Sequence, residues 1–165
     1  MTKDGYVNGS DMLLKIGGKA CGHCTSHTMT INSETKDRQV KPVASAPASS
    51  SLWKNKGVTG LSVSISAEGL CFYKETENGF QACLPMIVAG QSVEVECMER
   101  GSDKPYATGK FVVASLEKTD PAQDDSTYSI SLENDGVVDF DEAALTNGDE
   151  AASAAKVDTK SAARV

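Results

Sequence analysis

Aromatic side chains are scarce in this 165-residue sequence, which has four Phe, four Tyr and one Trp, and hydrophobic residues make up only 39% of it. The length fits one domain, but the composition excludes a generous core, so we expect part of the chain to order only against partners. The sequence has no apolar run near the roughly 20 residues of a membrane-spanning helix, and its start lacks the apolar segment of a secretion signal. We therefore expect neither a membrane protein nor a secreted one.

Positive charge is scarce as well. The chain has 16 Lys and Arg against 23 Asp and Glu, which gives a net charge of −7. Phosphate contacts require clustered Lys and Arg, so this balance argues against a protein that binds nucleic acid. The five cysteines are an odd number in a chain without a secretion signal. We therefore expect reduced thiols and the cytoplasm of the producing cell.

Alternating patterns, together with one short apolar run at residues 11–16, predict about six strands. They lie at residues 11–16, 25–35, 61–67, 92–98, 106–117 and 127–133. The clearest is Leu61-Ser-Val-Ser-Ile-Ser-Ala67, with Leu61, Val63 and Ile65 on one face and serines on the other. Apolar residues spaced by three and four predict one short helix over Phe80–Val88, closed by Gly90, with Pro85 tolerated only near the first turn.

These elements predict a mainly β fold, an antiparallel β-sandwich or partly closed barrel with the helix covering an open edge. Residues 1–140 would form this domain, and residues 141–165 an Ala-rich acidic tail. Residues 36–60 form a connection of unusual length, which tends to be functional. It is either a flexible loop or a long β-hairpin arm that folds only against a neighbour.

The sequence Cys21-Gly22-His23-Cys24 is identical to the active site of protein disulfide isomerases and suggests a thiol–disulfide oxidoreductase as an alternative function. That chemistry requires the motif to open a helix. Here the following residues alternate like a strand, which argues against the enzyme. Together with His27 the motif offers four zinc ligands, but the spacing is too compact for the usual structural sites. Cys71, Cys83 and Cys97 are expected to be small buried hydrophobic residues.

Other catalytic or cofactor-binding patterns are missing from the sequence, including phosphate-binding loops and metalloprotease motifs. Acidic residues after the last predicted strand could hold calcium, but their spacing is not that of an EF-hand, so a solvated acidic tail is favoured. They are Asp135, Asp139, Asp141 and Glu142. We therefore expect no catalytic, cofactor-binding or metal-binding residues, no cofactor and no enzymatic activity.

The order of features over roughly residues 7–138 resembles the major tail tube proteins of long-tailed, siphovirus-like bacteriophages. The matching segments are Gly9-Ser-Asp-Met-Leu-Leu-Lys-Ile16, Thr28-Met-Thr-Ile-Asn-Ser-Glu-Thr35, Lys36-Asp37, Leu52-Trp-Lys-Asn-Lys-Gly57, Leu61-Ser-Val-Ser-Ile-Ser-Ala67, Gly90-Gln-Ser-Val-Glu-Val95 and Thr127-Tyr-Ser-Ile-Ser-Leu-Glu133. The Cys21–Cys24 segment and the chain after Phe140 depart from the family pattern.

The resemblance implies a structural virion protein that assembles in the host cytoplasm into hexameric rings. The rings stack into the tail tube, through which DNA passes without specific binding. The implied partners are other copies of the chain and the tape measure, tail terminator and baseplate or tail-tip proteins. Residues 36–60 would contact the adjacent ring, through Lys36, Asp37, Arg38, Val43, Trp53 and Lys54.

Related tubes occur in contractile tails and bacterial secretion machines, and the resemblance covers those uses too. A third alternative is a β-sandwich binding module that uses the 36–60 segment.

Overall fold

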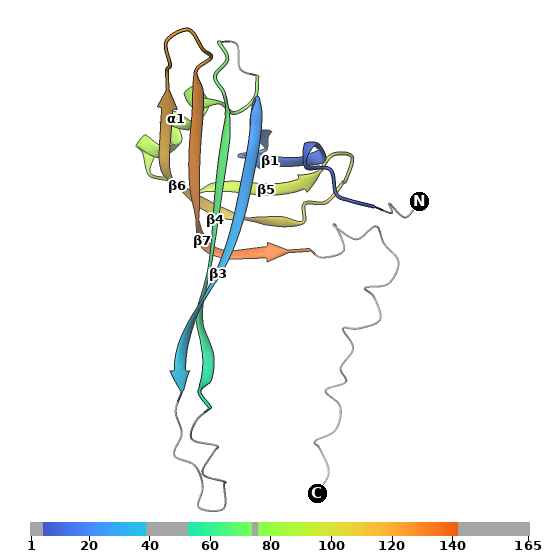
Figure 1. Ribbon diagram of the computed structural model, residues 1–165, viewed down its shortest axis with the longest axis vertical. Coiled ribbons are helices and arrows are strands. Elements are labelled where there is room, and N and C mark those ends of the chain that lie inside the picture. The colour runs from blue at the N-terminus through green and yellow to red at the C-terminus, as the bar shows by residue number, and fades with distance from the viewer. Residues whose placement is uncertain (1–4, 39–52, 74–75, 142–165) are drawn as a thin grey trace, which may run out of the picture.

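A computed structural model describes residues 5–38, 53–73 and 76–141 (Figure 1). The elements are a 3-10 turn η1 (Gly9–Asp11), β1 (Met12–Ile16), β2 (Lys19–Ala20), β3 (Cys24–Arg38), β4 (Asn55–Leu70), α1 (Phe80–Ala89), β5 (Val93–Glu99), β6 (Ala107–Thr119) and β7 (Thr127–Phe140). The strands form one antiparallel sheet in the order β2-β1-β5-β6-β7-β4-β3. The prediction of a mainly β fold with one short helix is confirmed, and the sheet is not closed.

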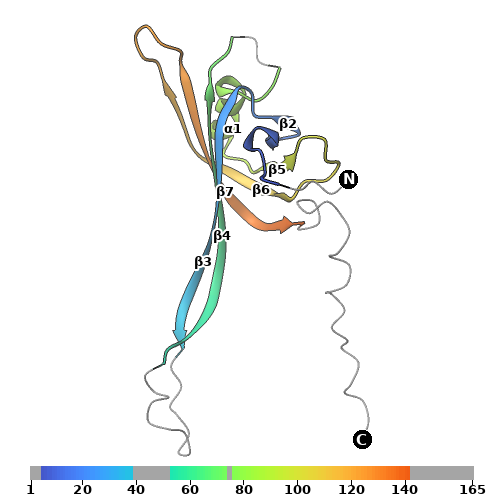
Figure 2. The same cartoon turned by 45° about the vertical axis from the view of Figure 1, so that its right-hand side comes forward.

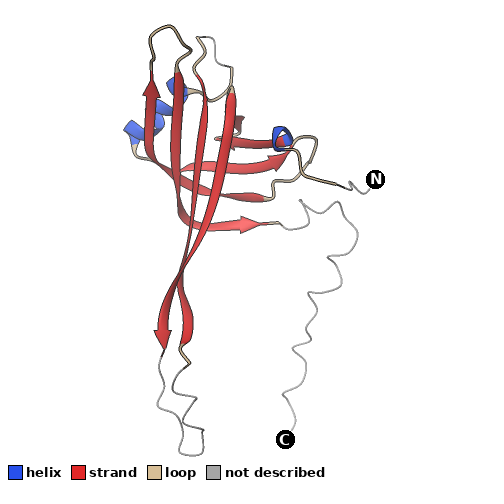
Figure 3. Cartoon of the chain, in the orientation of Figure 1, coloured by secondary structure: helices blue, strands red, loops and turns tan. Residues whose placement is uncertain are grey.

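Long strands β6 and β7 belong to both halves of the sheet, which bends across them (Figures 2 and 3). The ladder between β6 and β7 is irregular at two places: Ala114 is an extra residue in β6, and residues 135–137 of β7 lie opposite Lys110 alone. On β7, pairing with β4 ends at Glu133, and the side chain of Asn134 then accepts a hydrogen bond from the Val63 backbone N–H at 2.9 Å. Bulges sharpen twist and bending, so one sheet can wrap around a single core.

The core lies on the concave side of this bent sheet. Its largest fully buried side chains come from five strands and the helix: Tyr128, Phe111, Ile16, Ile65, Ile130, Leu132, Val95, Cys83 and Cys97. Val63 and Ile65 are buried as their alternation predicts, but Leu61, on the same face, is 70% exposed. Leu61 lies on the part of β4 that pairs only with β3, beyond the point at which β7 leaves β4.

Helix α1 matches the predicted helix and ends at Gly90, which has φ +62° and donates its N–H to Ile87 O at 3.2 Å. Pro85 is the sixth helical residue, so the expectation that it lies near the first turn was wrong. The helix tolerates it because the exposed ring points to solvent and only one backbone bond, to Gln81 O, is lost. Beyond Phe111, β6 pairs only with β7 among the described residues, and α1 packs beside this open edge.

Strands β3 and β4 run on past the sheet as a two-stranded ribbon (Figure 1). The sequence left open whether residues 36–60 form a flexible loop or a hairpin arm. Residues 36–38 and 55–60 belong to the paired strands of a hairpin arm. Residues 39–52, and with them Val43, lie outside the described residues. The last strand continues from Glu133 to Phe140, so Asp135 and Asp139 belong to β7 and not to a tail.

Candidate functional site

The hairpin ribbon, residues 31–38 and 55–62, carries an apolar stripe. In its register Ile31 pairs with Val63, Ser33 with Leu61 and Thr35 with Val58, with one extra residue in β4 between the last two pairs. Directly paired residues lie on the same face, so the stripe continues outward from the core. Ile31, Leu61 and Val58 are 55%, 70% and 61% exposed. An apolar face of this kind on a projecting element indicates a surface that another molecule covers.

The far end of the ribbon holds the predicted contact residues that the structure describes. Lys36, Asp37 and Arg38 end β3, and Asp37 lies 3.9 Å from Lys54 in an exposed ion pair. Such a pair contributes little to stability, so these charges do not hold the ribbon together. Trp53 is 81% exposed. The structure thus brings Asp37 and Lys54 together.

A polar face covers the other side of the same strands. Apart from Val112 of β6, which pairs with Glu133, its members are hydroxyl, amide or carboxylate side chains: Ser26, Thr28, Thr30 and Asn32 of β3; Ser62, Ser64, Ser66 and Glu68 of β4; Ser129, Ser131 and Glu133 of β7; and Ser115 and Glu117 of β6. This set contains no Lys or Arg. The serine alternation signals such a face, but only the register shows that four strands present it together.

Two strand edges that bound one four-strand unit lack a partner within the described part of the chain. One is the outer edge of β3 and the other is the edge of β6 after Phe111. Both bound the same four strands, in the order β6-β7-β4-β3. Unpaired edges are templates for another strand, so a subunit with one at each end of a four-strand unit can join copies in a row.

A turn at Cys21–Cys24 connects β2 to β3, the two outermost strands of the open sheet. Two neighbours hold it, and one of them also binds the residues before it. Gly22 N–H donates to Asn78 O at 2.6 Å, and Tyr128 Oη donates to Gly22 O at 2.7 Å. The buried Asn78 side chain donates to Lys19 O at 2.8 Å and to Ile16 O. The turn is therefore fixed to both halves of the sheet.

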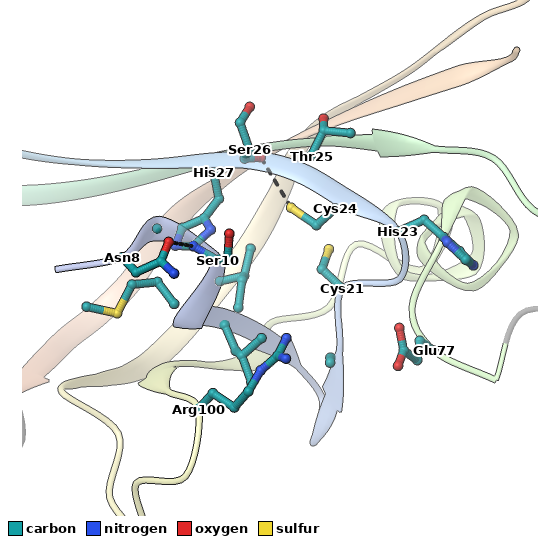
Figure 4. A pocket seen from close by; sticks show the side chains of 15 residues that line it. Asn8, Ser10, Cys21, His23, Cys24, Thr25, Ser26, His27, Glu77 and Arg100 are labelled. Atoms are coloured by element: carbon teal, nitrogen blue, oxygen red, sulfur yellow. Dashed lines mark hydrogen bonds between the residues drawn. The ribbon is translucent and has the colours of Figure 1, made fainter.

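Two thiols from this turn meet in an open groove of about 890 Å³ (Figure 4). Cys21 is buried, whereas Cys24 is partly exposed and its Sγ lies 3.2 Å from Ser26 O. In a regular strand, residues three positions apart point to opposite faces. The register shift at Thr25 instead places Cys24 and His27 on the same side of β3. Hydrogen bonds from Cys21 and then His27 lower the pKa of Cys24 to about 5, against burial, which raises it.

The pKa of the partner thiol, Cys21, shifts in the opposite direction. Its hydrogen bond with Cys24, followed by burial, raises the pKa of Cys21. Burial likewise raises the pKa of Tyr128, whose hydroxyl lies 3.7 Å from the Cys21 sulfur. These opposite directions favour the thiolate at the partly exposed Cys24 and the thiol at the buried Cys21.

The enzyme and zinc interpretations of this motif fail on geometry. Cys24 opens a strand and not a helix, as the alternation predicts. The His23 ring points away and stacks on Phe72 at 4.7 Å (Figure 4). Across residues 5–38, 53–73 and 76–141, no three His, Cys, Asp or Glu side chains gather as metal ligands. Asp135 instead accepts a hydrogen bond from Ser92, and Glu142 lies outside the described residues.

The other cysteines follow the expectation in part. Cys83 and Cys97 are buried, and Cys71 is partly exposed. Burial raises the pKa of Cys97 to about 11. The neutral thiol is thereby favoured, as expected for a cysteine that packs like a small apolar side chain. Within the described residues, no helix is both long and apolar enough to cross a membrane.

Comparison with known families gives one match to a family model. The model is described as "Phage tail tube protein" and covers residues 6–140. No curated protein matches the sequence.

Among solved structures, a chain of a native gene transfer agent virion matches at 20% identity and a TM-score of 0.64, over 82% of this chain and 99% of that chain. The tail of the empty particle, which has C6 symmetry, gives the same TM-score and coverage at 18% identity. The tail tube of SPP1 matches at 15% identity and TM-score 0.52, over 85% and 83% of the two chains.

Tubes of other machines share the fold. The sheath–tube complex of an extracellular contractile injection system matches at 14% identity and TM-score 0.53, over 82% and 93% of the chains. A tube-terminating cap of the anti-feeding prophage matches at 11% identity and TM-score 0.55, over 86% and 95%. At these identities the likeness is one of fold.

Proposed function

Because the chain belongs to the phage tail tube protein family, a family of structural and non-enzymatic virion proteins, we propose that its copies join edge to edge into rings that stack into the tail tube. One observation carries the proposal: a four-strand unit with an unpaired edge on each side, from which an apolar ribbon projects. A monomer leaves all three features uncovered, and a stacked ring covers them.

The ring forms when the β3 edge of one copy pairs with the open β6 edge of the next. The C6 symmetry of the gene transfer agent tail supports six copies. Four strands from each give a barrel of roughly 24 strands, about 4.8 Å apart and tilted by about 40°, so the backbone ring is about 50 Å in diameter. Such a channel is wide enough for a DNA duplex, and closing the barrel pairs both free edges of the four-strand unit.

The polar face is the wall of the channel in this arrangement. The opposite side of the four strands carries the core, so only this face can point to the lumen. Glu68, Glu117 and Glu133 give it negative charge, and the set contains no Lys or Arg. A wall of hydroxyls and carboxylates repels phosphate and offers no contacts that would retain DNA.

The hairpin ribbon makes the contact between rings. Its apolar stripe, Ile31, Val58 and Leu61, packs on the neighbouring ring, and its charged end adds polar contacts there. The proposed contact residues are Lys36, Asp37, Arg38, Val43, Trp53 and Lys54. This contact is heterologous and does not close on itself, so repetition produces a filament.

The tube also needs partners at its ends and in its lumen. We propose a terminator, a baseplate or tail-tip complex and a tape measure protein, the first supported by the shared fold of a tube-terminating cap. We also propose the division into a tube domain, residues 1–140, and an acidic C-terminal tail, residues 141–165.

Negative-stain electron microscopy of Val58→Asp and Leu61→Asp tests the stacking. Both residues are exposed, so the domain should fold, but a charge in the stripe should leave single rings where the wild type forms tubes. Ser62→Asp, a neighbour on the polar face, is the matched control and should still form tubes. A wild-type protein that stays monomeric at high concentration, or tubes of normal length from both stripe variants, would contradict the proposal.

A further inference from the structure

The family explains the sheet, the ribbon and the polar face, but not the paired thiols of the Cys21–Cys24 turn. We propose that Cys21 and Cys24 form a reversible redox site in this subunit, in which small-molecule disulfides convert the dithiol into an intrachain disulfide. Cys24 is the attacking sulfur and Cys21 is the resolving one. The site is a modification site of a structural protein and does not act on other proteins.

The backbone supports such a bond. Residues 21–24 form a turn in which His23 has φ +49°. A β-turn holds its first and last Cα atoms less than about 7 Å apart. A disulfide requires Cα atoms about 4.4–6.8 Å apart. The two side chains also face the same groove and interact in the reduced protein (Figure 4). Closing the bond therefore asks for rotation of the side chains more than movement of strands.

The surroundings assign the two roles. Cys24 is the partly exposed sulfur in the open groove, so a small disulfide reaches it first. His27, on the same side of β3, stabilises its thiolate. Cys21 is buried behind it under the Tyr128 hydroxyl, where it contacts Cys24 but not bulk solvent. An accessible thiolate beside a protected thiol is the arrangement of an attacking and a resolving cysteine.

The reaction balances in two exchange steps. The Cys24 thiolate attacks one sulfur of a disulfide such as oxidised glutathione, forming a mixed disulfide and releasing a glutathione thiolate with the electron pair of the broken S–S bond. Cys21 then attacks the Cys24 sulfur while its proton passes to the departing glutathione sulfur, so the second glutathione leaves as a thiol. Two protein thiols are oxidised and one glutathione disulfide is reduced. A dithiol reductant reverses both steps.

The position of the site gives the bond a consequence. The turn joins the two outermost strands of an open sheet, and Tyr128 and Asn78 bind it to the rest of the domain. A disulfide across the turn fixes this junction. Reversal is easy because a low-pKa thiolate such as Cys24 is a good leaving group and because so short a loop gains little from closure.

The test is incubation of the full-length protein with oxidised glutathione, followed by alkylation of remaining thiols and peptide mapping by mass spectrometry. The wild type should lose the mass of two hydrogens in the peptide with both Cys21 and Cys24. Cys21→Ser should stop at a glutathione adduct on Cys24. Cys24→Ser should react at residue 21 at least about tenfold more slowly than the wild type does at residue 24.

Cys71→Ser, which removes another partly exposed cysteine outside the groove, is the control and should oxidise like the wild type. Circular dichroism checks that each variant is folded. If Cys24→Ser does not fold, the wild type and Cys21→Ser still decide the matter. A wild type that keeps both thiols alkylatable, or a Cys21→Ser protein in which Cys71 is glutathionylated before Cys24, would overturn the assignment.

Discussion

At the residue scale, Gly69 shows how closely the turn at Cys21–Cys24 is packed. A Cβ at this position of β4 would lie 2.7 Å from Tyr128 Cε1 and 2.8 Å from His23 O. Neither atom can move easily, because the Tyr128 hydroxyl is bonded to Gly22 O and the His23 carbonyl accepts the Leu70 N–H. A glycine is thus required by the approach of two neighbours.

We expect Gly69→Ala to lower the free energy of unfolding by about 1–3 kcal/mol, the range for overpacked core positions. Gly60→Ala is the control, since its Cβ would meet Glu34 Oε2 at 3.4 Å, the end of a flexible exposed side chain. Urea denaturation followed by circular dichroism measures both. Equal effects of the two substitutions would show that strand propensity, and not the contact with Tyr128, sets the cost.

The thiolate at Cys24 makes stability depend on pH. Its pKa is 9.0 in the unfolded reference and about 5 in the folded protein. A depressed pKa contributes stability that is fully present above pH 9 and is lost as the pH falls toward 5. We therefore expect the difference in Tm between the reduced wild type and Cys24→Ser to shrink steadily from pH 8.5 to pH 5.

Comparison with the serine variant removes the contributions of Cys97 and Tyr106, which both proteins share. Calorimetry at constant ionic strength provides the measurement. A difference in Tm that stays constant, or grows as the pH falls, would show that Cys24 is protonated in the folded protein.

At the element scale, the sequence predicted the places of the strands better than their ends. A short apolar run indicated β1, and alternation indicated the other five longer strands, because side chains on a half-buried strand alternate whatever their partners are. It missed the continuation of β7 through Asp135, Gly136 and Asp139, where bulges and a bend break the period of two. It also missed the two-residue β2, which is too short to carry a pattern.

Helix α1 offers a direct test of element stability. We expect Pro85→Ala to raise the free energy of unfolding by about 1–3 kcal/mol, since alanine supplies the N–H that proline lacks and Pro85 is exposed. Part of that gain is offset because the unfolded chain becomes freer. Thermal unfolding measures the change. A lower Tm would mean that packing of the Pro85 ring stabilises the protein more than the restored backbone hydrogen bond does.

At the scale of the whole molecule, the order of the strands in the sheet could not be predicted from local sequence patterns. Nothing in the residues of β2 and β3 shows that they are the two outer strands of one sheet, because register depends on partners far along the chain. The candidate site was likewise predictable only in part. The contact residues at the charged end of the ribbon were implied by the family resemblance and stay a prediction, whereas the four-strand polar face and the placement of Cys24 beside His27 depend on register and a bulge.

The charge of the proposed lumen is open to measurement. We expect tubes of Glu68→Lys/Glu133→Lys to retain short duplex DNA in co-sedimentation, with binding that weakens steeply as salt rises, because inward cations contact phosphate. Tubes of the wild type should retain none.

Asp103→Lys/Asp125→Lys is the control with the same change in net charge, and both of its positions lie in turns outside the strands of the polar face. If this control retained as much DNA as the polar-face variant, the polar face would not be the lumen wall.

The shared strand β7 has a mechanical consequence. The ribbon is joined to the body through the seven-residue ladder that runs from Ser64–Glu133 to Leu70–Thr127, and β7 in turn is paired along most of its length with β6. A pull on the ribbon along its own axis loads these hydrogen bonds in shear, so they bear the tension together and do not unzip one after another. The subunit would thus yield to an axial load only by losing much of its sheet at once, as suits a link in a filament.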